Sequence, residues 1–231
     1  MPEAELFNDQ QIDQQIIASW HTNATPWTSA VRERRIESRR LVTDQAICDA
    51  VVSRAPSTVI DIGCGEGWLA RTLSQRGIRV LGLDVVPALI EQAQAAGGGE
   101  FRVASYEEIA GGAIPVRADL LVCNFSLIGK ESVEGLMRAA PGLLTPRGTL
   151  VIQTLHPIVA GGDLPYRDGW RAGSWQGFDA AFTDPAPWYF RTLGSWFALL
   201  ARHRLHVIEM LEPLHPSTSQ PASVIFVTAP E

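Results

Sequence analysis

The chain has 231 residues, 46% of them hydrophobic, which is enough for one large domain or for a domain with an elaboration. A net charge of −6 argues against general binding to nucleic acids or acidic membranes, and no apolar run is long enough to span a bilayer. The three cysteines lack the spacing of a metal site, and the polar start lacks the pattern of a signal peptide, so a cytoplasmic protein is predicted.

The first 54 residues predict an N-terminal helical cap. Residues 9–20 and roughly 29–54 have helical patterns, and Pro26 is expected to break the chain between them. The second helix carries the one basic run, "VRERRIESRR", in which two glutamates alternate with arginines at helical spacing. This spacing favours a solvated helix face with internal salt bridges, and an RNA-binding arm is the least favoured alternative at this net charge.

Residues 55–231 predict one α/β domain. Apolar runs alternate with helical patterns from residue 57 onwards, and the expected strands are "STVIDI", "IRVLGLD", "EFRVA", "ADLLVCNF" and "GTLVIQTL". This alternation predicts a doubly wound parallel sheet with helices on both faces. The closing runs "RLHVIEMLEP" and "ASVIFVTAP" are joined by a segment too short for a crossover helix, so they are expected to be antiparallel neighbours.

An insertion interrupts this rhythm at about residues 156–187. It is rich in Gly, Pro, Asp and Trp, and it follows the fifth expected strand. A loop segment of this length inside a compact domain is usually functional, and its position places it over the carboxyl ends of the strands. We therefore interpret the insertion as a substrate lid with an aromatic wall, in preference to plain packing.

The stretch "VIDIGCGEGWLARTL" places a glycine-rich turn at the end of the first strand. A dinucleotide site would need glycine at the sixth position counted from Gly63, which is Trp68, and the carboxylates of Asp61 and Glu66 would repel a pyrophosphate. S-adenosylmethionine instead carries a sulfonium and an ammonium, which these carboxylates attract. Asp84 ends the second strand about twenty residues after Gly63, where a carboxylate can accept both ribose hydroxyls.

The motifs "VIDIGCGEGWLARTL", "VLGLDVVPALIEQA" and "LLTPRGTLVI" resemble those of the class I S-adenosylmethionine-dependent methyltransferases. They are most similar to the small-molecule type that includes the ubiquinone-biosynthesis O-methyltransferases. The resemblance covers roughly residues 57–155, and the closing hairpin is similar in kind. It implies a seven-stranded sheet in the order 3-2-1-4-5-7-6 with one antiparallel strand. It also implies S-adenosylmethionine as cofactor and S-adenosylhomocysteine as product.

The resemblance also implies which residues contact the cofactor. The methionine end would lie against Asp61 and the turn, and the ribose against the end of the second strand. Many members have a carboxylate for the adenine amino group after the third strand, where this chain has a serine and a tyrosine. An arginine of the helix before the first strand would bind the methionine carboxylate. The cofactor-binding residues so predicted are Asp61, Gly63, Cys64, Gly65, Asp84, Val85, Ser105, Tyr106, Asn124 and Arg39, with Arg35 as the alternative arginine.

His156 is the first residue after the fifth strand and is the predicted catalytic base. The alternative is a histidine that bonds to the backbone and shapes the loop before Pro157. A nucleophilic role for Cys64 is disfavoured because no basic partner is close in sequence. No metal is expected, since the acids and histidines show no ligand spacing.

The predicted reaction is methyl transfer to an oxygen or nitrogen of a small aromatic or apolar acceptor, by a monomer or homodimer. No nucleic acid or membrane partner is expected. Two alternatives remain open: a protein that binds S-adenosylmethionine without transferring the methyl group, and a methyltransferase acting on tRNA or protein. A nicotinamide dehydrogenase is disfavoured by Trp68 and Asp61.

Overall fold

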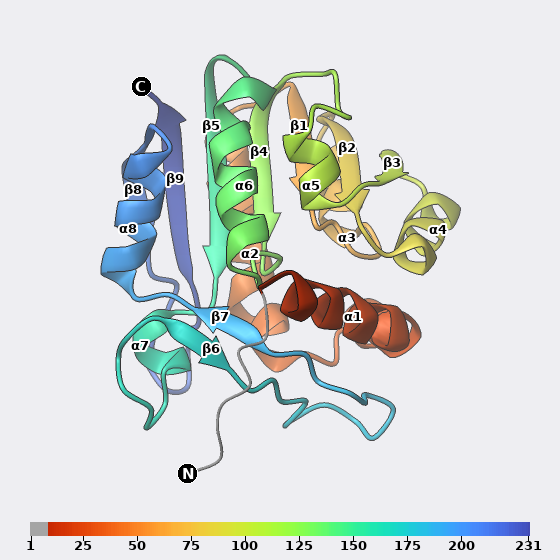
Figure 1. Ribbon diagram of the computed structural model, residues 1–231. Coiled ribbons are helices and arrows are strands. Elements are labelled where there is room, and N and C mark those ends of the chain that lie inside the picture. Colours follow the sequence, from red (N-terminus) through yellow and green to blue (C-terminus); the bar gives the residue numbers. More distant parts are fainter. Residues whose placement is uncertain (1–8) are drawn as a thin grey trace.

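The structure, a computed structural model, describes residues 9–231. Its main feature is a seven-stranded sheet in the order β3-β2-β1-β4-β5-β9-β8 (Figure 1). The strands are β1 (Thr58–Ile62), β2 (Arg79–Asp84), β3 (Glu100–Val103), β4 (Ala118–Asn124), β5 (Leu144–Thr154), β8 (Leu205–Leu211) and β9 (Val224–Pro230). Strand β9 runs antiparallel to both of its neighbours, β5 and β8. The fold class and the strand order predicted from the sequence are confirmed.

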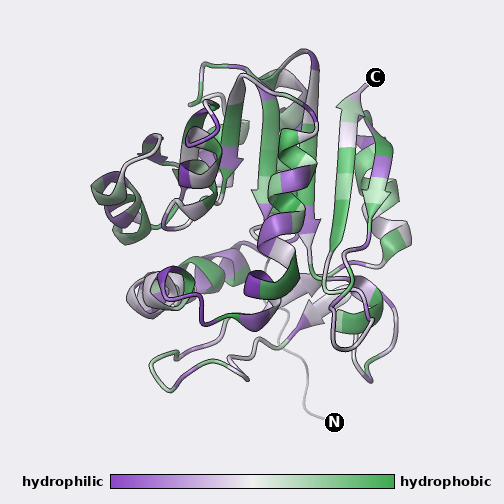
Figure 2. Cartoon of the chain, turned by 180° about the vertical axis from the view of Figure 1, so that it is seen from behind, coloured by the Kyte–Doolittle hydropathy of each residue, from purple (hydrophilic) through white to green (hydrophobic). Residues whose placement is uncertain are grey.

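Helices cover both faces of the sheet (Figure 1). One face packs against α5 (Tyr106–Ala110), α6 (Glu131–Ala139), the short 3₁₀ turn η2 (Ala140–Leu143) and α8 (Leu193–Arg202). The other face packs against α2 (Asp44–Val52), α3 (Trp68–Ser74) and α4 (Pro87–Ala96). The central strands are apolar on both sides because each side faces a helical layer, and Figure 2 shows this as strands coloured hydrophobic through the middle of the sheet.

The N-terminal segment differs from its prediction. Helix α1 (Asp9–Arg32) continues through Pro26, and the predicted break there is wrong. Proline removes one backbone donor, whose partner would be the carbonyl of Thr22, and Thr22 is exposed to solvent. The chain breaks instead after Arg32, where Arg34 has a φ of 55°, and resumes as a π-helix, η1 (Arg39–Thr43), that continues into α2. The described part of this segment therefore has two continuous helical stretches, as predicted, but the break between them falls after Arg32 and not at Pro26.

Helix α1 lies across the carboxyl ends of the strands, and the insertion lies beside it (Figure 1). The insertion contains a short helix, α7 (Pro157–Ala160), and strand β6 (Gly169–Arg171), which pairs antiparallel with β7 (Trp188–Phe190) directly after the insertion. None of the helices between residues 9 and 231 is long and apolar enough to cross a membrane.

Candidate active site

The glycine turn between β1 and α3 folds back onto the end of β2. The backbone N–H groups of Gly63 and Cys64 both donate to the carbonyl of Leu83, at 2.7 and 3.0 Å. Gly63 has a φ of 76°, and a Cβ atom there would lie 2.3 Å from Cβ of Ser126. Only glycine satisfies both the left-handed backbone and this close approach of the loop that follows β4. The turn is thereby held against both neighbouring strand ends.

Asp84 ends β2 beside this turn and is only 9% exposed. One carboxylate oxygen accepts from the N–H of Gly65 at 2.8 Å, and the other from the N–H of Val86 at 3.0 Å. Burial raises the pKa of Asp84, although these backbone bonds oppose the shift. The two bonds fix the orientation of the carboxylate, and each oxygen keeps a lone pair for a further donor.

Asp61, at the end of β1, is 1% exposed, and neither of its carboxylate oxygens has a hydrogen-bond partner among the described residues. Burial raises the pKa of Asp61 to about 7, and the charge of Asp84 adds to the effect. A buried carboxylate without a partner is costly, so its presence needs an explanation. A cationic ligand at this position would supply the missing donors and the missing charge.

Asn124 on β4 and Gln153 on β5 extend this arrangement along the edge of the sheet. The two residues are paired in register, and Asp61 pairs with Val122, two positions before Asn124. Because side chains alternate between the faces of a strand, Asp61, Asn124 and Gln153 all lie on the face covered by α2 and α3. The side-chain oxygens of Asn124 and Gln153 are also buried without a partner in residues 9–231. We call these three residues the acceptor row.

The π-helix η1 brings hydrogen-bond donors to the same edge. Helix α2 packs against β4, β5 and β9, and it begins at the carboxyl ends of β4 and β5 because it ends shortly before β1 starts. Thr43 lies one turn before the buried Ile47, on the face directed at the sheet, and its hydroxyl is buried without a partner among the described residues. Sequence reasoning missed Thr43 and Gln153 because no local pattern marks either residue.

Arg39, the first residue of η1, is 8% exposed. Its guanidinium group lies over the ring of Trp68 at 4.7 Å and that of Trp27 at 5.6 Å, and its Nε donates to Asp44 at 2.9 Å. One terminal nitrogen, Nη2, is buried and has no hydrogen-bond partner in the described chain. Arg35, the alternative in the sequence analysis, is instead paired with Asp179 and Glu33 on the surface.

Glu66 does not present its charge to a ligand, contrary to the expectation that it acts together with Asp61. Its side chain is fully buried and accepts from Arg32 at 2.9 Å and from Arg71 at 2.6 and 2.7 Å. These bonds join the end of α1 to the start of α3. The two arginines neutralise the carboxylate, so Glu66 serves to hold the cap against the glycine turn.

Ser105 and Tyr106 lie after β3, where an adenine contact is predicted. Ser105 is the N-cap of α5: its hydroxyl accepts from the N–H of Glu108 at 3.1 Å, and its own N–H donates to the Glu108 carboxylate at 2.7 Å. The Tyr106 hydroxyl donates to the carbonyl of Ser126 at 2.9 Å. Both residues therefore stabilise loops at the carboxyl edge, and their contact with adenine stays a prediction.

His156 is 1% exposed, and both of its ring nitrogens are engaged. Nδ1 accepts from the N–H of Ile158 at 3.3 Å and caps α7, so the proton lies on Nε2, which donates to Glu212 at 2.8 Å. A base needs a free lone pair facing the reacting group. The catalytic role of His156 stays a prediction, and this geometry favours the alternative of a histidine that shapes the loop.

Aromatic residues join α1 to the insertion above the glycine turn. A Cβ atom at Gly65 would lie 3.6 Å from the indole nitrogen of Trp27. From Trp27 the ring contacts continue to Phe178 at 6.4 Å between centroids, and from there to Trp175 at 5.4 Å and Phe182 at 4.8 Å. Aromatic rings of α1 and of the insertion therefore lie together beside the turn, and the role of the insertion as a substrate lid stays a prediction.

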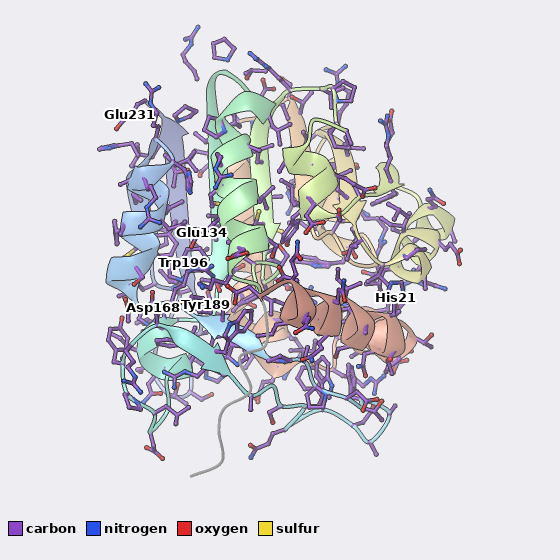
Figure 3. All side chains as sticks on the ribbon, in the orientation of Figure 1. His21, Glu134, Asp168, Tyr189, Trp196 and Glu231 are labelled. Atoms are coloured by element: carbon purple, nitrogen blue, oxygen red, sulfur yellow. The ribbon has the colours of Figure 1, made fainter. Side chains whose placement is uncertain are left out.

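Polar contacts fix the last part of the insertion and the segment that follows it. Near the end of the insertion, the buried Asn23 of α1 donates to the Thr183 carbonyl at 2.8 Å and accepts from the Thr183 N–H at 3.0 Å. Just after the insertion, Arg191 donates to the carbonyls of Gly129 and Lys130 and lies over the rings of Tyr189 and Trp196, which are labelled in Figure 3. The insertion is therefore tied both to the cap and to the loop after β4.

The described residues contain no group of three or more His, Cys, Asp or Glu side chains that could hold a metal ion. The thiol of Cys64 is buried, and burial together with the charge of Asp61 holds its pKa well above the usual value. This disfavours a thiolate nucleophile. The polar groups available for ligand binding are therefore Asp84, the acceptor row, and the donors on η1.

A family model described as a methyltransferase domain matches residues 42–198, which is more than half of the chain. The chain belongs to this family of methyltransferase domains.

Relatives and solved structures agree with the family. A ubiquinone biosynthesis O-methyltransferase of Leptothrix cholodnii is 33% identical over 104 residues, which cover 42% of this chain and 44% of the relative. The chain thus matches less than half of that protein's length. A methyltransferase from Mesorhizobium loti, described as S-adenosylmethionine-dependent, has a TM-score of 0.60 at 21% identity, covering 83% of this chain and 97% of its own. A glycopeptide N-methyltransferase in complex with sinefungin has a TM-score of 0.63 at 13% identity, covering 80% and 86%.

Proposed function

We propose that this chain transfers a methyl group from S-adenosylmethionine to an oxygen or nitrogen atom of a small acceptor. The observation that carries the proposal is the buried carboxylate of Asp61, which has no partner among the described residues and adjoins a glycine turn. A cation that brings N–H donors satisfies this group, whereas a phosphate would add a second negative charge. The family membership of the chain supports the same conclusion.

The polar groups match the parts of S-adenosylmethionine one by one. Asp84, fixed by two backbone N–H groups, suits the two ribose hydroxyls. Asp61 suits the ammonium group. The free guanidinium nitrogen of Arg39 and the Thr43 hydroxyl suit the carboxylate of the methionine end. The set contains donors for the one anionic group and acceptors for the cationic and hydroxyl groups, so the residues present fit this cofactor.

When bound, the cofactor supplies a methyl group on a positively charged sulfur. The chain's own contribution is positional: Asp84 and Asp61 fix two ends of the ligand, and the aromatic lid excludes water from above. Holding two reactants in line accounts for much of the acceleration of such a transfer. Exclusion of water strengthens every charge interaction within the crevice.

A second candidate, a nucleic acid acceptor, is favoured by a groove of about 460 Å³ between the cap and α3. The lining includes five arginines, Arg32, Arg34, Arg40, Arg71 and Arg76. Two of these neutralise Glu66, and the whole chain is acidic, so we rank this candidate second. If the protein does not shift the mobility of bulk tRNA at about 50 mM salt, a nucleic acid acceptor is ruled out.

The proposed function is tested by two measurements on the intact chain. Calorimetric titration should detect binding of S-adenosylmethionine and S-adenosylhomocysteine, and no binding of NAD. Incubation with methyl-labelled cofactor and a panel of small phenols, amines and carboxylates should then transfer label to at least one class. Binding without transfer to any of them would support the alternative of a binding protein, and tight NAD binding would refute the proposal.

A further inference from the structure

The acceptor row is longer than the cofactor's amino-acid end requires. Neighbouring strands lie about 4.8 Å apart, so the row from Asp61 through Asn124 to Gln153 spans roughly 10 Å in the direction across the sheet. Asp84, the proposed ribose ligand, lies on β2, on the opposite side of β1. With the ribose over β2 and the ammonium over β1, the ends of β4 and β5 are left for the second substrate.

Each of the two residues at these strand ends has a buried side-chain oxygen that accepts a hydrogen bond from no described residue. The amide nitrogen of Gln153 donates to the Ser223 hydroxyl at 2.8 Å, which fixes the side chain and leaves its oxygen unpartnered among the described residues. The side-chain oxygen of Asn124, on the adjacent strand, is also buried and has no hydrogen-bond partner among the described residues. Any group seated between them must bring hydrogens, and two oxygens on neighbouring strands require two of them.

We infer that the methyl acceptor is an aromatic amine whose NH₂ group is held by the side-chain oxygens of Asn124 and Gln153. This inference rests on the proposed function and narrows it to nitrogen. One amino group supplies both hydrogens, whereas a hydroxyl group supplies one and leaves the second oxygen unpaired. A phenolate would be worse, because its negative charge would face these oxygens and the carboxylate of Asp61.

The absence of a free base near the row supports the same choice. A phenol or alcohol must lose its proton before or during the transfer, whereas a neutral amine attacks with its own lone pair. His156 has both ring nitrogens engaged. Burial raises the pKa values of the nearby Cys64, Cys123 and Tyr106 side chains, and Asp61 faces the ammonium group. An aromatic amine is the class of amine that is already neutral near pH 7, and the aromatic lid suits its ring.

The step balances without a further reactant. The amine lone pair forms the N–C bond to the methyl carbon as the C–S bond breaks. The electron pair of the C–S bond goes to sulfur. The positive charge passes from sulfur to nitrogen, giving an N-methylammonium that still carries two hydrogens for Asn124 and Gln153. That product then loses one proton to bulk water when it leaves.

The test uses matched pairs of aromatic probes that differ only in the attacking group: aniline and phenol, 1-naphthylamine and 1-naphthol, and 8-aminoquinoline and 8-hydroxyquinoline. Transfer of labelled methyl is measured on the intact protein, and the product is identified by mass spectrometry. We expect N-methyl products, with kcat/KM at least tenfold higher for the amine of a pair. Equal or preferred methylation of the phenols, or of neither member of any pair, would overturn the inference.

Variants connect this preference to the two residues. Gln153→Leu and Asn124→Leu should each lower kcat/KM for the amine about tenfold, the loss of one hydrogen bond, and Gln153→Leu should leave S-adenosylmethionine affinity unchanged. Gln153→Asn, which keeps the amide but withdraws its oxygen, covers the case that Gln153→Leu does not fold. The exposed Gln220→Leu is the matched control. If the folded variants keep the preference for the amine, Asn124 and Gln153 do not hold the amino group, and the inference is refuted. If the unmodified chain does not bind S-adenosylmethionine, the proposed function is refuted instead.

Discussion

Two aspartates on neighbouring strands, Asp61 and Asp119, stand at opposite ends of the same sheet. Asp119, at the amino end of β4, accepts from the N–H groups of Ser57 and Thr58 and from the hydroxyls of Thr58 and Thr145, all at 3.0 to 3.1 Å. Asp61, at the carboxyl end of β1, accepts from no described residue.

Their pKa values move in opposite directions. Burial raises both, but at Asp119 the hydrogen bonds from Thr58, Ser57 and Thr145 outweigh it and lower the pKa, whereas nothing offsets the rise to about 7 at Asp61. The comparison indicates that the amino end of the sheet is built for stability and that the carboxyl end retains an unfavourable charge for a ligand to satisfy.

Exchanging each carboxylate for an amide gives the largest expected effects. Asp61→Asn should weaken S-adenosylmethionine binding about a hundredfold, because a charge-assisted bond contributes roughly 1.5–3 kcal/mol. It should also raise the free energy of unfolding at pH 8, where the buried carboxylate is charged. Asp119→Asn should do the reverse, with lower stability and unchanged affinity. Calorimetry measures the cofactor affinity of both variants, and urea unfolding measures their stability. Weaker cofactor binding by Asp119→Asn alone would contradict the assignment of Asp61 to ligand binding and of Asp119 to stability.

The pH dependence follows from the same shifts. Because the pKa of Asp61 is raised, the folded protein holds a proton that its unfolded chain releases, and this residue destabilises the fold progressively from about pH 4 to pH 7. An ammonium ligand needs the charged form, so cofactor affinity should rise as the pH goes from 5 to 7, by up to about tenfold per pH unit. The rise should vanish in Asp61→Asn. A flat profile in the unmodified protein would contradict the ion pair.

Arg39→Met should lower cofactor affinity about tenfold, since a partly buried guanidinium would no longer meet the methionine carboxylate. The exposed neighbour Arg40→Met is the control and should bind normally. S-adenosylmethionine and its decarboxylated analogue should bind equally to Arg39→Met, and unequally to the unmodified chain. If the analogue instead loses affinity in the variant to the same degree as the cofactor, Arg39 acts only through packing on Trp27 and Trp68.

Asn23→Ala removes both hydrogen bonds that hold Thr183 to α1. We expect hydrogen exchange over residues 172–187 to increase, and KM for the acceptor to rise a few-fold as the lid loosens. The exposed Thr22→Ala, one position before it, should change neither. Unaltered exchange in Asn23→Ala would mean that the aromatic contacts alone hold the insertion.

His156→Ala should have the smallest effect on cofactor affinity. If His156 shapes the loop, Glu212→Gln should cause a similar, partial loss of turnover, accompanied by lower stability. If His156 is instead the base, turnover should fall by two or more orders of magnitude in His156→Ala alone. Steady-state kinetics of the two variants separates these outcomes.

Much of the fold and part of the site could be predicted because their signals are local. Continuous apolar runs mark strands covered on both faces, and the turn chemistry of Gly63 to Gly67 marks the ligand crevice. Asp84 could be located because the sequence predicts where the second strand ends. The continuation of α1 through Pro26 could not be predicted, since it depends on how the turn before the proline is exposed in the folded chain.

The amino-acid sequence by itself determined the α/β class, the strand order through its family motifs, and the acidic strand ends beside a glycine turn. Only the tertiary structure decided how each polar group is used. It pairs Glu66 with Arg32 and Arg71, His156 with Glu212, and Asn23 with Thr183, and it brings Thr43 and Gln153 to the edge where Asp61 lies. The reason is physical: a side chain's charge and hydrogen bonds depend on neighbours that the folded backbone supplies from distant parts of the chain.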